Sequence, residues 1–182
     1  MELQSERQLP WPRQRVWDAL NDPAILQLCI PGCESLEATD DQGFDALVQA
    51  KVGPVKARFR GHVSVIDPSP PESYTLRFEG QGGAAGFARG EADVQLSEAD
   101  DGGSILRYSA RATVGGKLAQ IGSRLVQATA RKMADDFFDN FITQLQGGDG
   151  TAAEQPPPPA AEKAKQRNWK FWSSTGRNAD SP

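Results

Sequence analysis

The chain has 182 residues, with 20 basic and 24 acidic side chains, one histidine and two cysteines. This length allows one domain and a tail. Residues 163–177 hold five basic residues and no acid, so the remainder (15 basic, 24 acidic) has a net charge of −9. An acidic body argues against nucleic acid as the main partner.

Other bulk features exclude further classes. Cys29 and Cys33 are too few for a disulfide scaffold. No apolar run approaches the roughly 20 residues of a transmembrane helix. The first residues also lack the apolar core of a signal peptide. We therefore expect a cytoplasmic protein.

The periodicity predicts an α+β chain. Residues 2–9 alternate as a strand, and two short helices follow at 13–21 and 24–28. Six antiparallel strands are expected next, and the alternation locates five of them at residues 44–52, 55–65, 74–78, 88–96 and 106–114.

The last predicted element is one long helix over residues 117–146, between glycine pairs 115–116 and 147–148. Its second half is aromatic and resembles ordinary core, whereas its first half has small residues and could close over a cavity. Alternatively, both halves pack on one curved sheet. An antiparallel sheet with its helices at the ends must curl around the long helix, which predicts a helix-grip fold.

Many inward-facing strand positions are small: Ala46, Ala50, Ala57, Gly61, Ala88, Gly90, Ala92, Ala110 and Ala112. A sheet that curls on a helix with such residues leaves room for an apolar cavity. The alternative is that Trp11, Trp17 and the aromatic residues at 137–141 fill the space.

Catalytic and metal-binding patterns are weak. The alternation places His62 on the outward face of its strand, so no nucleophile and histidine pair is predicted in a pocket. Cys29 and Cys33 have no second ligand pair, so no zinc site is expected. The glycine-rich segment 80–86 is followed by a strand rather than a helix, which argues against a dinucleotide site. We interpret it as a mobile loop at the cavity rim or a plain hairpin loop.

The composition changes at Gly147. Residues 147–162 form a Gly/Pro-rich linker after a domain at 1–146. Residues 163–182 form a basic, aromatic tail that we expect to be disordered. Such a tail suits an anionic bilayer or a partner protein, or it has no role. The candidate docking residues are Lys163, Lys165, Arg167, Trp169, Lys170, Phe171 and Trp172.

Five segments stand out in order along the chain: Ile30-Pro31-Gly32-Cys33-Glu34, the sequence from Val52 to Gly61, Pro71-Glu72-Ser73-Tyr74, Gly83-Ala84-Ala85-Gly86-Phe87 and the sequence from Gly115 to Arg124. Together they resemble the G-subunit family of carbon monoxide dehydrogenase, which belongs to the START-like, polyketide-cyclase-like SRPBCC superfamily. The resemblance covers roughly residues 1–146.

The resemblance implies a helix-grip fold with a hydrophobic cavity. It also implies a role beside a molybdenum carbon monoxide dehydrogenase or a related molybdenum hydroxylase. Family members are thought to attach that enzyme to the cytoplasmic membrane and to carry a quinone. Some members end in a hydrophobic anchor, whereas this sequence ends in the basic aromatic tail. Peripheral association with the inner face of that membrane is therefore expected.

Two classes of function follow. The first is a non-catalytic carrier and adaptor with no covalent cofactor and a bound quinone or similar lipophilic molecule. The second is a START-like enzyme of the cyclase or dehydratase type. A third interpretation is a docking subunit with a filled core. The predicted ligand-binding residues are Phe59, Gly61, Phe78, Phe87, Tyr108, Ile121 and Leu125.

Overall fold

A computed structural model describes residues 1–151, so most of the predicted linker and all of the predicted tail lie outside the described residues. The chain begins with β1 (Glu2–Leu9), α1 (Arg13–Leu20) and α2 (Pro23–Cys29). Six strands follow: β2 (Cys33–Ala38), β3 (Gly43–Val52), β4 (Val55–Ser69), β5 (Ser73–Gln81), β6 (Phe87–Glu98) and β7 (Ser104–Gly115). A short 3-10 turn, η1 (Gly83–Ala85), separates β5 from β6.

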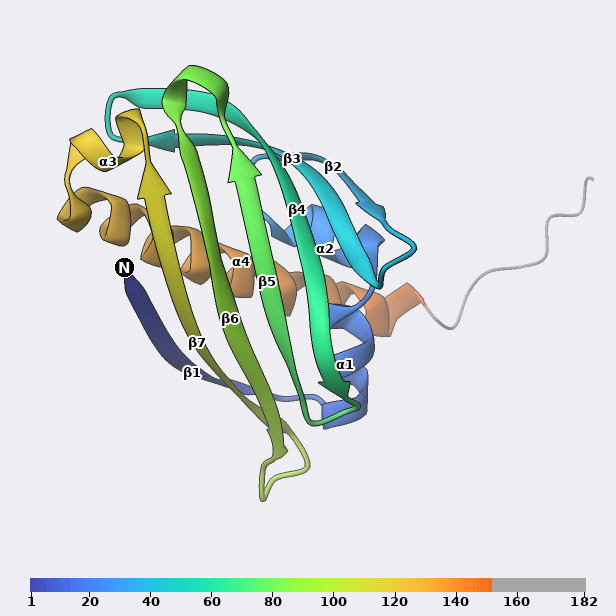
Figure 1. Ribbon diagram of the computed structural model, residues 1–182. Helices are drawn as coiled ribbons and strands as arrows, with labels where there is room; N and C mark the ends of the chain where they lie inside the picture. Colours follow the sequence, from blue (N-terminus) through green and yellow to red (C-terminus); the bar gives the residue numbers. More distant parts are fainter. Residues whose placement is uncertain (152–182) are drawn as a thin grey trace, which may run out of the picture. The chain divides into compact units, whose positions relative to one another are not determined.

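The strands form one antiparallel sheet in the order β1-β7-β6-β5-β4-β3-β2. Consecutive strands from β2 to β7 are neighbours, and β1 pairs with β7, the last strand in the chain. The sheet curves around the C-terminal helix, with α1 and α2 towards one end and α3 towards the other (Figure 1). The predicted α+β helix-grip fold is confirmed, and β2 is the strand that the alternation did not locate.

The predicted single helix over residues 117–146 is wrong in its continuity and in its end. It is divided into α3 (Lys117–Ile121) and α4 (Ser123–Thr151). The break lies at Gly122, whose φ of 105° falls where side-chain-bearing residues are rarely found. Gly116, the residue just before α3, also has a positive φ, of 69°. Helix α4 also continues past the glycine pair that was expected to end it.

The two halves of the long helical segment face different partners. Phe138, Phe141 and Leu145 of α4 lie in the main core with Trp11 and Trp17, as predicted for the aromatic half. Leu118 and Val126 instead form a second cluster with Val52, under the turn that joins β3 to β4. This change of partner explains why the apolar stripe rotates along the sequence.

Polar contacts fix α4 against its neighbours. The side-chain amide of Asn140 donates a hydrogen bond to the backbone carbonyl of Cys29 at 3.1 Å, which ties α4 to the end of α2. The guanidinium of Arg7 on β1 forms an ion pair with Asp135 and lies over the ring of Phe138. Helix α4 is thereby held to both edges of the fold.

Candidate functional site

One row of residues that face one another across adjacent strands of the sheet consists only of glycine and alanine. Ala46 pairs with Gly61, Gly61 with Gly80, and Gly80 with Ala88, so the row crosses four adjacent strands. A Cβ built at Gly61 would come no closer than 3.6 Å to a neighbouring atom, and one at Gly80 no closer than 3.9 Å. The backbone therefore does not require glycine at either position, and the missing side chains leave open space.

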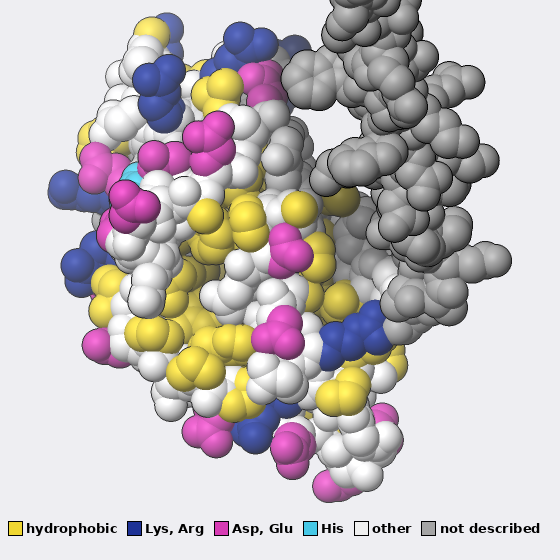
Figure 2. Space-filling model, turned by 90° about the vertical axis from the view of Figure 1, so that its right-hand side faces the viewer, with side chains coloured by type: hydrophobic (Ala, Val, Ile, Leu, Met, Phe, Trp, Pro, Cys, Tyr) yellow, Lys and Arg dark blue, Asp and Glu magenta, His cyan; other side chains and the backbone are white. Residues whose placement is uncertain are grey.

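The space is a cavity of about 520 Å³ between the sheet and the helices. This volume falls in the range of roughly 300–1,000 Å³ that is typical of small-molecule sites. Figure 2 shows hydrophobic side chains lining a hollow on the face in view, with charged side chains around it. The smallest of the lining residues, besides the row above, are Ala92, Ala110 and Ala134.

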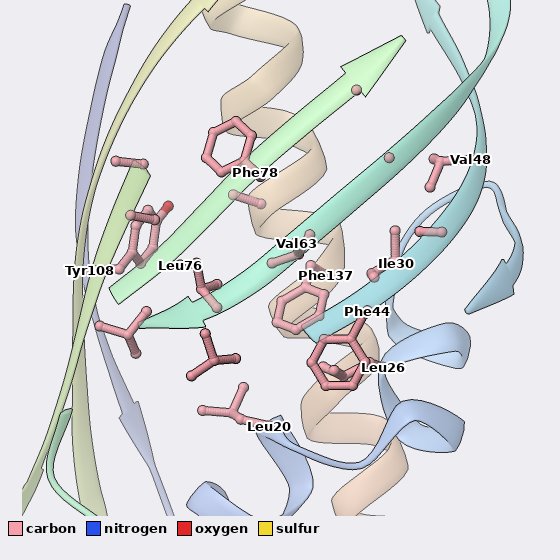
Figure 3. Close-up of a pocket in the computed structure, with 18 of the residues that line it drawn as sticks. Leu20, Leu26, Ile30, Phe44, Val48, Val63, Leu76, Phe78, Tyr108 and Phe137 are labelled. Atoms are coloured by element: carbon pink, nitrogen blue, oxygen red, sulfur yellow. The ribbon is translucent and has the colours of Figure 1, made fainter. Parts of the chain in front are cut away.

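Helices and strands both contribute walls. The helices supply Leu20 from α1, Leu26 from α2 and Phe137 from α4, and the sheet supplies Phe44 and Val63 opposite them (Figure 3). The other labelled residues in that view are Ile30, Val48, Leu76, Phe78 and Tyr108.

The large side chains that could have filled the cavity leave it open. Trp11 and Trp17 are buried in the main core and are not among the lining residues. Phe137 and Phe138 instead form part of the wall, and Phe141 is fully buried beyond it. The predicted aromatic residues therefore enclose the space rather than occupy it.

Four of the seven predicted ligand-binding residues line this cavity: Phe59, Gly61, Phe78 and Tyr108. The other three do not line it. Phe87 lies against Gly115, with the guanidinium of Arg89 5.7 Å from the centre of its ring. Leu125 is 41% exposed beside Gly53 at the β3–β4 turn, and Ile121 packs in the cluster under that turn. Ligand binding at the four lining positions stays a prediction.

The sequence reasoning missed the walls contributed by β1, β2 and the short helices. They come from Leu3, Leu20, Leu26, Ile30 and Leu36. Leu3 had a usable signal, because it alternates in phase with buried Leu9 on β1. No local sequence pattern indicates that α2 lines the cavity, because this depends on how the helix packs against β2.

His62 lies directly opposite Asp45 on the neighbouring strand. Its Nδ1 is 2.6 Å from Asp45 Oδ1, and its Nε2 is 3.2 Å from Asp41 Oδ2. The hydrogen bond to Asp45 raises the pKa of His62, and the neighbouring charge of Asp41 acts in the same direction. The imidazole is 44% exposed and pairs with these acids, in agreement with the predicted outward orientation.

The two cysteines lie in surroundings that favour a packing role. Cys29 is fully buried, and this burial raises the pKa of its thiol to about 11. The Cys33 thiol donates a weak hydrogen bond to the Ser35 carbonyl at 3.3 Å. Within residues 1–151, no group of three or more His, Cys, Asp or Glu side chains is arranged to hold a metal ion.

The glycine-rich segment leads into a strand, as expected. Residues 83–85 make one 3-10 turn, and β6 starts at Phe87. Gly86 has a φ of 107°, and a Cβ there would lie 2.0 Å from the Gly115 carbonyl oxygen. This glycine is therefore required where the loop meets the end of β7.

In the described part of the chain, no helix has the length and hydropathy of a membrane-spanning segment.

Solved structures share this fold. The crystal structure of a conserved protein from Geobacillus kaustophilus is 33% identical, with a TM-score of 0.76, and covers 81% of this chain and 96% of that one. A Thermus thermophilus protein is 18% identical, with a TM-score of 0.62, and covers 81% of this chain and 99% of that one. A protein from Rhizobium leguminosarum is 19% identical, with a TM-score of 0.61 and coverages of 80% and 94%.

No curated protein matches the chain. A family model for the G subunit of carbon monoxide dehydrogenase (CoxG) matches residues 6–146. This match begins within β1 and ends within α4, and it contains every other strand of the sheet and all the cavity-lining residues except Leu3. The chain therefore belongs to the CoxG family of carbon monoxide dehydrogenase G subunits.

Proposed function

We propose that the protein is a non-catalytic accessory subunit of a molybdenum carbon monoxide dehydrogenase, or of a related molybdenum hydroxylase. In this proposal it binds a lipophilic molecule, such as a quinone, and links the enzyme to the cytoplasmic membrane. Membership of the CoxG family supports the accessory role. The observation that supports ligand binding is the apolar cavity of about 520 Å³.

The physical case for a lipophilic ligand rests on the lining. Moving apolar surface out of water stabilises a complex by about 25 cal/mol per Å². Flat aromatic walls such as Phe44, Phe78 and Phe137 suit a planar ring, and the small row leaves room for it. A quinone combines a planar ring with an apolar chain, so its shape and hydropathy match the cavity.

The surroundings of the reactive groups support a non-catalytic role. His62 is 44% exposed and pairs with Asp41 and Asp45, and the Ser64 hydroxyl 3.2 Å from its Nε2 is not among the residues that line the cavity. The Cys29 thiol has a pKa of about 11, so it is protonated at neutral pH and is a poor nucleophile. These two observations disfavour the cyclase or dehydratase alternative.

The link to the membrane or to the dehydrogenase is proposed for the tail, residues 163–182. Its basic and aromatic residues suit an anionic surface, where each Lys or Arg contributes about 1 kcal/mol. This part of the proposal rests on the sequence alone, because these residues lie outside the described range.

Native isolation tests the proposal. The protein, purified from its own cells with the enzyme that accompanies it, is extracted with organic solvent, and the extract is analysed by mass spectrometry. A quinone in an amount close to that of the protein is the expected result. Recovery of the dehydrogenase with no lipophilic molecule would instead indicate a pure docking subunit, and recovery of neither would overturn the proposal.

A further inference from the structure

The chain has two tyrosines, and both line the cavity. Tyr74 on β5 lies opposite Val94 on β6, and Val94 lies opposite Tyr108 on β7. The tyrosines therefore face inward at the same level of the sheet with one strand between them. Two strand spacings separate their backbones by roughly 10 Å.

Neither hydroxyl has a hydrogen-bond partner among the residues that the structure describes. Tyr74 is only 7% exposed. Tyr108 lines the same cavity, beside the apolar side chains drawn in Figure 3. A hydroxyl in such surroundings costs free energy unless a ligand or a water molecule satisfies it.

Both rings are held in fixed orientations by helical residues. Tyr108 stacks on Phe138 of α4, with ring centres 5.7 Å apart and an interplanar angle of 21°. Tyr74 meets Trp17 of α1 edge to face, at 5.2 Å and 77°. Phenylalanine could make these same ring contacts, so the packing does not explain the hydroxyls.

Burial favours the neutral, hydrogen-bond-donating form of the deeper tyrosine. It raises the pKa of Tyr74 far above its ordinary value, so this hydroxyl keeps its proton at any physiological pH. The Tyr74 hydroxyl can therefore donate a hydrogen bond to an oxygen of a bound ligand, where no water is present to make that bond. The carbonyl of a lipophilic ligand is such an acceptor.

We infer that the hydroxyls of Tyr74 and Tyr108 donate hydrogen bonds to acceptor oxygens of the ligand. They would make the cavity selective for a lipophilic molecule with a carbonyl-bearing ring over a hydrocarbon of the same shape. This inference rests on the proposed function, because it requires that the cavity takes up a ligand. It adds the chemical feature by which the ligand is chosen.

A matched pair of probes tests the selectivity. The first is a 2-methyl-3-alkyl-1,4-naphthoquinone, and the second is the naphthalene with the same alkyl groups and no oxygen. Dissociation constants are measured with the full-length protein, its Tyr74→Phe and Tyr108→Phe variants, and the double variant. Melting temperatures close to that of the wild type confirm that the variants are folded.

We expect the wild type to bind the naphthoquinone more tightly than the naphthalene. Each Tyr→Phe change should weaken naphthoquinone binding several-fold, and the double variant should weaken it by about 10-fold or more, as is typical for lost neutral hydrogen bonds. Affinity for the naphthalene should stay the same, which a general loss of packing would not produce.

The outcomes separate the two proposals. Binding of neither probe by the wild type would overturn the proposed function. Equal affinity of the wild type for both probes, or unchanged naphthoquinone affinity in the double variant, would overturn this inference while leaving cavity binding intact.

Discussion

Gly61 of β4 and Gly80 of β5 lie directly opposite each other, at the middle of a row that has alanine at both ends. Neither glycine has a positive φ, and a Cβ at either would make only ordinary contacts. The sheet could thus accommodate side chains here without backbone strain. The cavity exists because these positions are left empty.

An unfavourable charge pair flanks the turn between β3 and β4. Lys51 lies directly opposite Lys56, and both are exposed without an ion pair among the described residues. Like charges at facing positions destabilise a sheet. We expect Lys51→Glu to raise the free energy of unfolding by about 0.2–1 kcal/mol at low salt, measured by denaturant titration.

Lys51→Gln is the matched control, because it removes the repulsion without adding an attraction. It should give a smaller gain, and salt should reduce the difference between the two variants. A Lys51→Glu protein that is less stable than Lys51→Gln at low salt would contradict this account of the turn.

The two ends of α4 should differ in their contribution to stability. Phe141 is fully buried, whereas Leu125 is 41% exposed. Phe141→Ala should destabilise the protein by about 3–5 kcal/mol through lost contacts and a new void. Leu125→Ala should cost much less. Similar losses for both variants, measured by chemical unfolding, would show that the register of the helix is wrong.

The single histidine gives an unambiguous pH probe. Because Asp45 raises its pKa, His62 should titrate above its ordinary value of 6.5, and Asp45→Asn should bring the pKa down. The folded-state pKa is the higher one, so the small stabilisation from this contact is present below about pH 6.5 and is lost as the pH rises through the folded-state pKa. NMR titration of the imidazole measures both values. A wild-type pKa at or below 6.5 would refute the Asp45 contact.

The predicted tail can be tested by truncation. Full-length protein should sediment with anionic liposomes, less so at high salt, and the Trp169→Ala/Trp172→Ala variant should lose most of this binding. Protein truncated after Gly150 is the control. Equal sedimentation of the two lengths would exclude membrane binding by the tail. Loss of the dehydrogenase from a pull-down with the same truncation would identify a protein-docking segment.

Strand alternation predicted the sheet well, because inward and outward faces follow from spacing along a single strand. The same spacing correctly identified the small inward residues such as Gly61 and Ala88. It could not show where the helical segment breaks, since a single glycine such as Gly122 is locally compatible with a continuous helix. A continuous helix predicts that Ile121 and Leu125 line the cavity, whereas they pack at the β3–β4 turn.

The remaining misses depend on packing between distant segments. Phe87 has the inward phase of its strand, yet it lies at the end of β6 against Gly115 rather than in the cavity. The contributions of Leu26 and Ile30 require the position of α2 beside β2. No local pattern in the sequence encodes either arrangement.

The most direct test of the account is a binding titration of an alkyl naphthoquinone against the wild type and Gly61→Trp. Tryptophan at position 61 would extend into the cavity, so binding should be lost while the fold is retained. Arg60→Trp, on the exposed opposite face of the same strand, is the matched control and should bind like the wild type. Ala46→Phe repeats the test from the neighbouring strand. Wild-type affinity in folded Gly61→Trp and Ala46→Phe proteins would contradict the claim that this cavity holds the ligand.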